Sequence, residues 1–231
     1  MKARAVLIDV GGPILDEDHE YSAWDGFLLE LLTEQGISIT EEELARSIVD
    51  AIARCEHNPR VAAIWEIVRP DLDRFHHLKD ELREFQRRHL REEYVPRLRS
   101  GARDALEELS ERHVLALAGN QPAWIKGYLK ETGVLDLFDW QLVSEEMGLS
   151  KPDPLFFRMI LDRLSIAPSE AVMVGDRLDH DIFPAGLLRI HTVRVLIGPY
   201  REQIPPSPLH VPEATIASLL ELPAALAGAR G

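Results

Sequence analysis

The chain has 231 residues, and its 39 Asp and Glu residues outnumber its 26 Lys and Arg residues, which gives a formal net charge of −13 at pH 7. Because binding to a nucleic-acid backbone needs clustered positive charge, this balance argues against nucleic acid as the main partner. The hydrophobic fraction of 45% and the charged fraction of 28% are those of a globular protein and exclude general disorder.

The start of the chain and its cysteine content favour a reducing compartment. Cys55 is the single cysteine, so no intramolecular disulfide can form. The apolar run Val6-Leu7-Ile8 ends at Asp9 and is therefore too short for the apolar region of a signal peptide. No run approaches the roughly 18 apolar residues that a membrane helix needs. We therefore expect a cytoplasmic protein without a membrane partner.

A short apolar run at residues 4–8 begins the pattern of elements and ends in the turn-rich segment Asp9-Val-Gly-Gly-Pro. A continuous apolar run bounded by turn residues predicts a buried strand of a parallel sheet. The carboxyl edge of such a sheet is where open α/β proteins bind ligands, so this strand is expected to place Asp9 at a binding edge.

Residues 19–95 carry helical patterns rather than strand patterns. Apolar residues recur there at helical spacing, and Thr40 with Glu43 forms a capping-box pattern before a further helix. A long polar helix follows, and its histidines, His89 among them, are expected to be solvated rather than to bind zinc. We therefore expect a helical insertion without strands, in which Cys55 lies on a buried apolar helix face.

From Gly101 onward, predicted strands and helices alternate. The strands are expected at 114–118, 141–144, 171–174 and 192–197, with helices that begin near 102, at Pro122 and at Pro154 and a further helix over 182–188. Such alternation indicates a parallel sheet with right-handed crossovers. After an irregular proline-rich stretch at 205–212, we expect a short helix near 216–220.

Polar residues follow the ends of three predicted strands. Asp9 follows the first, Asn120 a second and Asp176 a third, with Asp181 five residues further on, and Lys151 lies between the second and the third. Because neighbouring carboxyl ends of a parallel sheet meet at one crevice, we expect these side chains to share a site. Carboxylates and an ammonium group suit Mg²⁺ together with an anion, since hard cations take oxygen ligands and a lysine neutralises anionic charge.

Four segments then make the sequence resemble the haloacid dehalogenase (HAD) superfamily, in the order Asp9-Val-Gly-Gly-Pro-Ile-Leu, Leu117-Ala-Gly-Asn120, Lys151-Pro-Asp-Pro and Gly175-Asp-Arg-Leu-Asp-His-Asp181. The helical stretch between the first two looks like the C1-type cap of the family's phosphatase branch. The resemblance implies an α/β architecture, with a Rossmann-like parallel-sheet core at residues 1–16 and 97–231 and an inserted helical cap domain at 17–96.

The resemblance also implies a role for each site residue. Asp9 would be the nucleophile that forms an aspartyl-phosphate, and Lys151 would hold the nucleophile and the transferring phosphoryl oxygens. Mg²⁺ would bind Asp9, Asp176 and the main-chain carbonyl of Gly11, with Asp181 as a further acidic partner, either directly or through another ligand. The phosphate would be positioned by side chains and main-chain N–H groups at Gly12, Gly119, Asn120 and Lys151.

Three positions depart from the pattern that the resemblance implies. Gly11 stands where the family's phosphatases carry an aspartate that protonates the leaving oxygen, and Pro13 and Gly119 stand where a hydroxyl residue is usual. General acid–base help is worth about 10²–10⁴-fold, so we expect a preference for good leaving groups, as in acyl phosphates or sugar-1-phosphates. Alternatively, the acid is one of the residues that follow the first motif: Asp16, Glu17, Asp18 or His19.

The function predicted from these features is a Mg²⁺-dependent hydrolase that acts on a small phosphorylated metabolite. Two alternatives stay open. One is a HAD-fold protein that binds a phosphorylated ligand or a partner with little or no turnover, and the other is a metal-independent 2-haloacid dehalogenase in which Asp9 displaces halide. The sequence leaves both the substrate and the choice between a monomer and a homodimer open.

Overall fold

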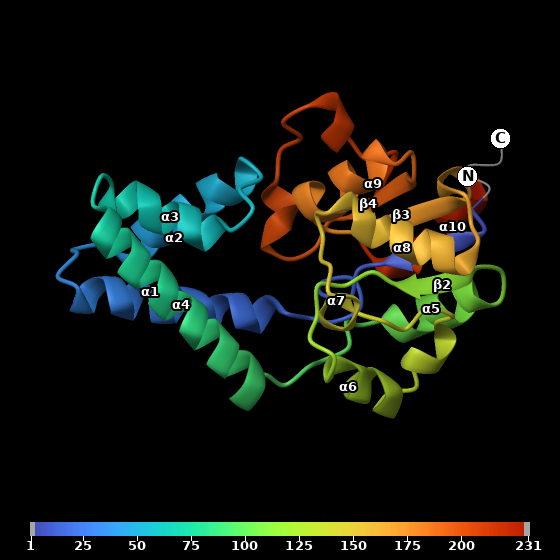
Figure 1. Ribbon diagram of the computed structural model, residues 1–231, viewed down its shortest axis with the longest axis horizontal. Helices are drawn as coiled ribbons and strands as arrows, with labels where there is room; N and C mark the ends of the chain where they lie inside the picture. Colours follow the sequence, from blue (N-terminus) through green and yellow to red (C-terminus); the bar gives the residue numbers. More distant parts are fainter. Residues whose placement is uncertain (1–2, 229–231) are drawn as a thin grey trace. The chain divides into compact units, whose positions relative to one another are not determined.

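The computed structural model describes residues 3–228, which form two compact units (Figure 1). The core unit contains the chain up to Asp16, Pro96–Arg201 and the chain from Pro205 onward. The helical unit contains Glu17–Val95 and the short segment Glu202–Ile204. No helix among the described residues combines the length and the hydropathy needed to cross a membrane.

The core unit is built on a parallel sheet, which confirms the predicted α/β architecture. Within the described residues its strands are β1 (Ala5–Ile8), β2 (Val114–Leu117), β3 (Ala171–Gly175), β4 (His191–Val195) and β5 (Ala214–Ile216). Their spatial order is β2-β1-β3-β4-β5, and each neighbouring pair is parallel. After β1 the chain forms β2, which pairs with one edge of β1, and later β3, which pairs with the opposite edge of β1. The carboxyl end of β1 is therefore the switch point of the sheet, where ligands bind in such folds.

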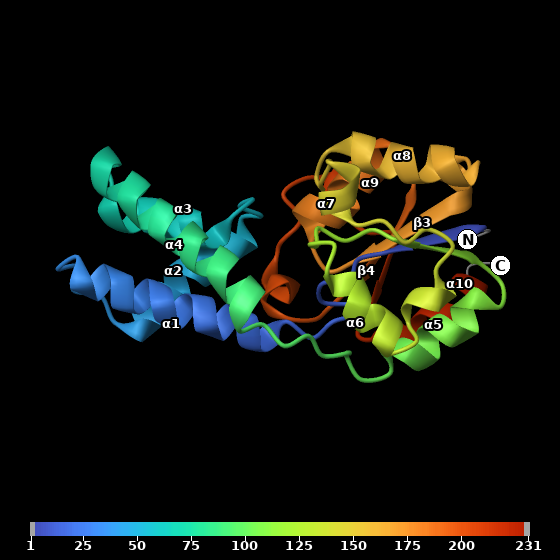
Figure 2. The ribbon, with the colours of Figure 1, turned by 60° about the horizontal axis from the view of Figure 1, so that its bottom comes forward.

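Helices cover both faces of this sheet. The core helices are α5 (Ala102–Ser110), α6 (Ile125–Glu131), α7 (Ser144–Met147), α8 (Pro154–Leu164), α9 (Phe183–Leu187) and α10 (Leu222–Gly228). Figure 2 shows α8 and α9 on one side of the strands and α5 and α10 on the other. Phe156 and Phe157 of α8 are fully buried and pack in one cluster with Leu7 of β1 and Met173 of β3. This apolar layer holds β1 and β3 in fixed positions against α8, and it thereby positions the residues that follow the two strands.

Two predictions for the core unit are wrong. Residues 141–143 form no strand, because only Trp140 makes an isolated bridge with Ala116 and Ser144 already begins α7. The Gln141 side chain instead donates hydrogen bonds to main-chain carbonyls of the preceding turn. The short helix expected over 216–220 is misplaced, because Ile216 ends β5, a 3-10 turn follows at Leu219–Glu221 and α10 begins at Leu222. Both misassigned segments are short, so periodicity distinguishes strand from helix poorly there.

The helical unit consists of α1 (Asp18–Glu34), α2 (Glu41–Ala53), α3 (Pro59–Val68) and α4 (Leu72–Glu92). The capping box is confirmed, since Thr40 Oγ1 accepts from the Glu43 N–H at 3.2 Å and Glu43 Oε2 accepts from the Thr40 N–H at 2.9 Å. No strand lies between Glu17 and Val95, a segment the structure describes throughout. The first and last helices of the unit, α1 and α4, pack together.

Two side chains of the helical unit lie elsewhere than expected. His89 is buried rather than solvated, with Nε2 2.7 Å from Glu20 Oε2 and Nδ1 3.1 Å from Glu93 Oε2. Packing of α1 against α4 buries the Glu20 carboxylate and supplies this partner, which the pattern of α4 alone does not reveal. Cys55 lies beyond the end of α2 with φ of 58°, and its Sγ donates to Ile204 O at 3.5 Å. It is half-buried at a turn and does not lie on a helix face.

Candidate active site

The predicted nucleophile lies directly after the central strand β1. The Asp9 N–H donates to Val174 O at 2.9 Å, so the ladder between β1 and β3 continues to this residue. Asp9 Oδ1 accepts from the Val10 N–H at 2.7 Å, which fixes one rotamer of the carboxylate. On the neighbouring strand, Asp176 follows the last residue of β3. The parallel register therefore brings these two carboxylates to the same edge of the sheet.

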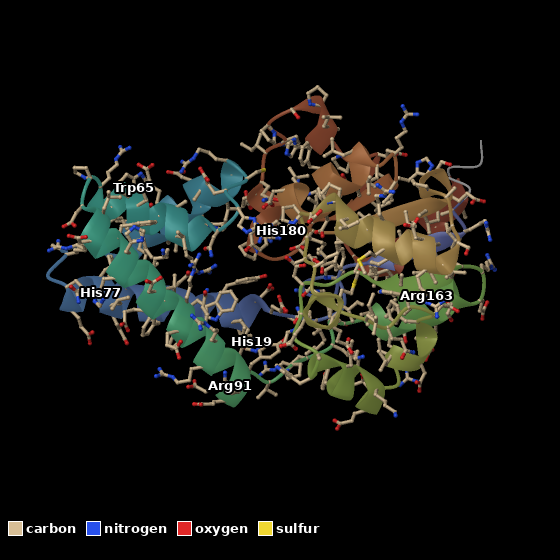
Figure 3. All side chains as sticks on the ribbon, in the orientation of Figure 1. His19, Trp65, His77, Arg91, Arg163 and His180 are labelled. Carbon is tan, nitrogen blue, oxygen red and sulfur yellow. The ribbon has the colours of Figure 1, made fainter. Side chains whose placement is uncertain are left out.

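Asp9, Asp176 and Asp181 form a carboxylate trio. One ligand oxygen from each lies within 4.8 Å of the others, and all three residues are buried. Asp181 comes from the π-helical turn Leu178–Ile182 that follows β3 (its neighbour His180 is labelled in Figure 3). A β-carbon at position 175 would lie only 2.3 Å from Asp181 Cγ. Gly175 is therefore required for Asp181 to pack against the end of β3.

Lys151 lies between two members of the trio. Its Nζ is 2.8 Å from Asp9 Oδ1 and 2.6 Å from Asp181 Oδ1, and the side chain is only 2% exposed. Burial disfavours the ammonium charge, but the charges of Asp181 and Asp9 outweigh this effect and raise the pKa of Lys151. The lysine is therefore a fixed cation at neutral pH.

Asn120 holds the main chain of this lysine. Its Oδ1 accepts from the Lys151 N–H at 2.8 Å, and its Nδ2 donates to Lys151 O at 2.9 Å. Both polar atoms of the amide therefore position Lys151. Contact between Asn120 and a phosphate group stays a prediction.

The site carries a surplus of negative charge, since the trio faces one ammonium group. Burial, followed by the charges of Asp9 and Asp181, raises the pKa of Asp176 well above its usual range. Oxygen donors that converge with uncompensated negative charge fit a hard divalent cation such as Mg²⁺. The donor set thus agrees with the metal that the sequence predicted.

The turn after Asp9 is held by hydrogen bonds from Arg99, a residue distant in sequence. Gly12 has φ of 89°, and a β-carbon there would lie 3.2 Å from the Asp176 carboxylate, so both conformation and space favour glycine. Arg99 Nε donates to Gly12 O at 2.6 Å, and Arg99 Nη2 donates to Asp16 Oδ1 at 3.3 Å. Arg99 was not anticipated, because it is nearly ninety residues away along the chain and belongs to no motif.

Gly119 faces Val10 across the end of the sheet. A β-carbon at position 119 would lie 2.6 Å from Val10 Cγ2. The branched side chain after the nucleophile thus occupies the space that a hydroxyl residue at position 119 would need. This contact gives a physical reason for one of the three departures noted in the sequence.

The candidate substitute acids fall into different units. Asp16 belongs to the core unit, where Arg99 pairs with it, whereas Glu17, Asp18 and His19 belong to the helical unit (His19 is labelled in Figure 3).

Two further arginines lie around Asp176. Arg194 of β4 is buried, and it donates to Asp176 O at 3.3 Å and to Tyr200 O at 2.6 Å. Arg177 is the residue after Asp176, and its N–H donates to Asp181 Oδ2 at 3.0 Å. A charged residue inside the otherwise apolar run Thr192 to Val195 was the available sequence signal for Arg194.

Comparison with known proteins gives a family match and several relatives with phosphatase names. A family model described as haloacid dehalogenase-like hydrolase matches residues 3–186. The glyceraldehyde 3-phosphate phosphatase of Methanocaldococcus jannaschii is 46% identical over 70 residues, which are 30% of this chain and 31% of that protein. The ribulose-1,5-bisphosphate 5-phosphatase of Halopiger xanaduensis is 42% identical over 94 residues, or 40% of this chain and 39% of that protein. The matches thus span well under half the length of these relatives.

Solved structures match over nearly the whole chain. The magnesium-bound HAD-hydrolase YfnB of Bacillus subtilis gives a TM-score of 0.65 at 24% identity, covering 98% of this chain and 99% of that chain. The HAD phosphatase of Thermococcus onnurineus gives a TM-score of 0.58 at 25% identity, covering 99% of each chain. These likenesses establish the fold.

Proposed function

The chain belongs to the haloacid dehalogenase-like hydrolases, and from this membership we propose that it hydrolyses the phosphate ester of a small metabolite through a phosphoryl group carried by Asp9. The observation that carries the proposal is the contact of 2.8 Å between Lys151 Nζ and Asp9 Oδ1 at the edge of the carboxylate trio. Two relatives of this chain are named as phosphatases of small phosphorylated compounds, and their names favour the same class of reaction.

In the proposed reaction Asp9 attacks the phosphorus atom, and the bond from phosphorus to the leaving oxygen breaks. Water then attacks the phosphorus of the aspartyl-phosphate, which releases phosphate and restores the carboxylate. The fixed positive charge of Lys151 holds the attacking oxygen and offsets charge on the transferring phosphoryl group. The main-chain N–H groups near Gly12 and Gly119 are the proposed donors to the other phosphoryl oxygens.

Asp9, Asp176 and the main-chain carbonyl of Gly11 are the proposed ligands of Mg²⁺, which when bound supplies positive charge to a phosphoryl oxygen. Asp181 is different, because both of its oxygens already accept hydrogen bonds, from Lys151 Nζ and from the Arg177 N–H. We assign it the orientation of Lys151 and of the turn after β3, with any contact to the metal made through another ligand.

Hydrolysis of acetyl phosphate, with and without Mg²⁺, tests this proposal in the wild-type protein and in Asp9→Asn. Because the variant lacks the nucleophilic oxygen, we expect Mg²⁺-dependent release of phosphate to fall by at least about 10³-fold. Circular dichroism confirms that the variant is folded.

Three other results would contradict the proposal. Hydrolysis that persists in Asp9→Asn would exclude the aspartyl-phosphate. Ligand binding without turnover in folded wild-type protein would favour a binding protein. Release of halide from a 2-haloacid without added metal would favour a dehalogenase.

A further inference from the structure

The guanidinium group of Arg177 is held in place by two side chains of the core unit. Its Nε lies 3.2 Å from Asp179 Oδ1 and its Nη2 2.5 Å from Asp179 Oδ2, which makes a bidentate ion pair. On its other side Nη1 donates to Tyr200 Oη at 3.3 Å, and the guanidinium carbon lies 4.3 Å from the centre of the Tyr200 ring. A planar guanidinium that is stacked and bidentately paired in this way has one strongly preferred orientation.

This orientation matters because Arg177 is the immediate neighbour of Asp176 along the chain. A long, flexible cation at this place is within one residue of the buried carboxylate trio. If it paired with the trio, it would neutralise the charge that a divalent cation needs and would occupy a ligand oxygen. Asp179 and Tyr200 are among the groups that give the guanidinium another partner.

We propose that Asp179 and Tyr200 are positioning residues that divert the Arg177 guanidinium from the carboxylate trio and so keep Asp9 and Asp176 available to Mg²⁺. This inference rests on the proposed function, because it takes Asp9 and Asp176 to be ligands of the metal. Asp179 and Tyr200 act through Arg177, and neither is a ligand in this scheme.

The surroundings of Asp179 agree with this role. His180 Nε2 lies 3.4 Å from Asp179 Oδ2, and the Asp179 charge also acts on His210. The Asp179 carboxylate, whose side chain is 12% exposed, is thus in a mostly buried, polar environment. Charge on one side chain is poorly screened by solvent there, so its removal has a measurable effect on a neighbouring cation site.

Isothermal titration of Mg²⁺ into metal-free protein measures the effect directly, without any activity. Asp179→Asn keeps the size of the side chain but removes the charge that pairs with Arg177. We expect its Kd for Mg²⁺ to rise about tenfold, as one displaced unit charge near a dication implies. Tyr200→Leu, which removes both the ring and the hydroxyl, is expected to shift the Kd in the same direction.

The double variant Arg177→Met with Asp179→Asn separates diversion from simple loss of structure. If Asp179 acts by holding the guanidinium, its removal has no cost once the guanidinium is absent, and the Kd returns to within about threefold of the wild-type value. Glu107→Gln is the control, because it removes the acid of another arginine–carboxylate pair, Arg103 with Glu107, on the exposed face of α5. It is expected to leave the Kd unchanged, and thermal unfolding verifies that each variant is folded.

The outcomes are distinguishable. A wild-type Kd for Asp179→Asn, or a double variant that binds Mg²⁺ as weakly as Asp179→Asn, would overturn the diversion of Arg177 while leaving the proposed phosphatase intact. Wild-type protein that binds no Mg²⁺ would overturn the metal site itself and this inference with it.

Discussion

Gly11 lies two residues after Asp9 and offers no side chain that donates a proton to a leaving oxygen. Unlike Gly12, it does not adopt a positive φ, so its backbone accommodates other residues. In the core unit the cation nearest to Asp9, Lys151, is held by two carboxylates. In the proposed reaction, the missing side chain at Gly11 favours substrates whose leaving groups depart without protonation.

Gly11→Asp restores a carboxyl group at this position, and Gly11→Asn is its matched control without an acidic proton. We expect the ratio of kcat/KM for an alkyl phosphate to that for acetyl phosphate to rise about 10²-fold in Gly11→Asp relative to Gly11→Asn, the low end of general-acid effects. Steady-state assays with both substrates measure this ratio. Equal ratios in the two variants, or a wild-type enzyme with no preference between the substrates, would mean that another residue supplies the acid.

Among the elements, the capping-box signal located the start of a helix, whereas one of the apolar runs predicted a strand that does not form. The capping box at Thr40 begins α2 where it was predicted, because two hydrogen bonds between neighbours in sequence fix that boundary. The strand predicted at 141–144 is absent, because pairing with the edge of the sheet is decided by residues distant in sequence. Features of helices and strands that depend on contacts between neighbours in sequence are therefore the easiest to predict.

Thr40→Ala tests the contribution of the cap. Losing the side-chain acceptor leaves an N–H group of the first turn unpaired, and we expect the free energy of unfolding of the helical unit to fall by about 1 kcal/mol. Urea unfolding followed by circular dichroism measures it. Thr33→Ala in the last turn of α1, where the hydroxyl donates only to Leu29 O within its own helix, is the control and is expected to change stability by less than about 0.5 kcal/mol. Equal effects of the two substitutions would show that the capping box adds nothing.

For the whole molecule, the proposed metal site would link metal binding to stability. Since the folded-state pKa of Asp176 lies above its unfolded value, ionising this carboxyl costs folding free energy. The cost is absent at a pH below the unfolded pKa of about 3.9 and grows as the pH rises through the folded-state pKa. Metal-free protein at neutral pH therefore carries this penalty, and a bound divalent cation offsets it.

We therefore expect Mg²⁺ to raise the Tm of the wild-type protein, with a stabilisation of about 2.7 kcal/mol when its concentration is 100 times its Kd. Asp176→Asn removes the unfavourable charge, so the variant is expected to unfold at a higher Tm than metal-free wild-type protein and to gain nothing from Mg²⁺. Scanning calorimetry with and without Mg²⁺ measures both effects. A variant with a lower Tm that still responds to Mg²⁺ would place the metal elsewhere.

The sequence alone predicted the family and the fold class correctly, and it named the residues to which the proposed reaction assigns roles. The apolar runs before Asp9 and Asp176 specify buried parallel strands, and parallel strands place their carboxyl ends together. From the sequence we could therefore predict that the polar residues after these strands form one site. Their order along the chain, with Lys151 between them, carried the resemblance to the family that the comparisons establish.

The side chains that support that site became visible only from the packing of the folded chain. Arg99, Arg194 and Tyr200 reach the first and last motifs from distant parts of the chain, and no local pattern reports a contact across such separations. Burial of His89 with Glu20 likewise depends on packing between α1 and α4. Strand and capping patterns depend on residues that are close in sequence, so they can be recognised in the sequence itself. The partners of a buried charge depend on how the whole chain packs, so they cannot be recognised there.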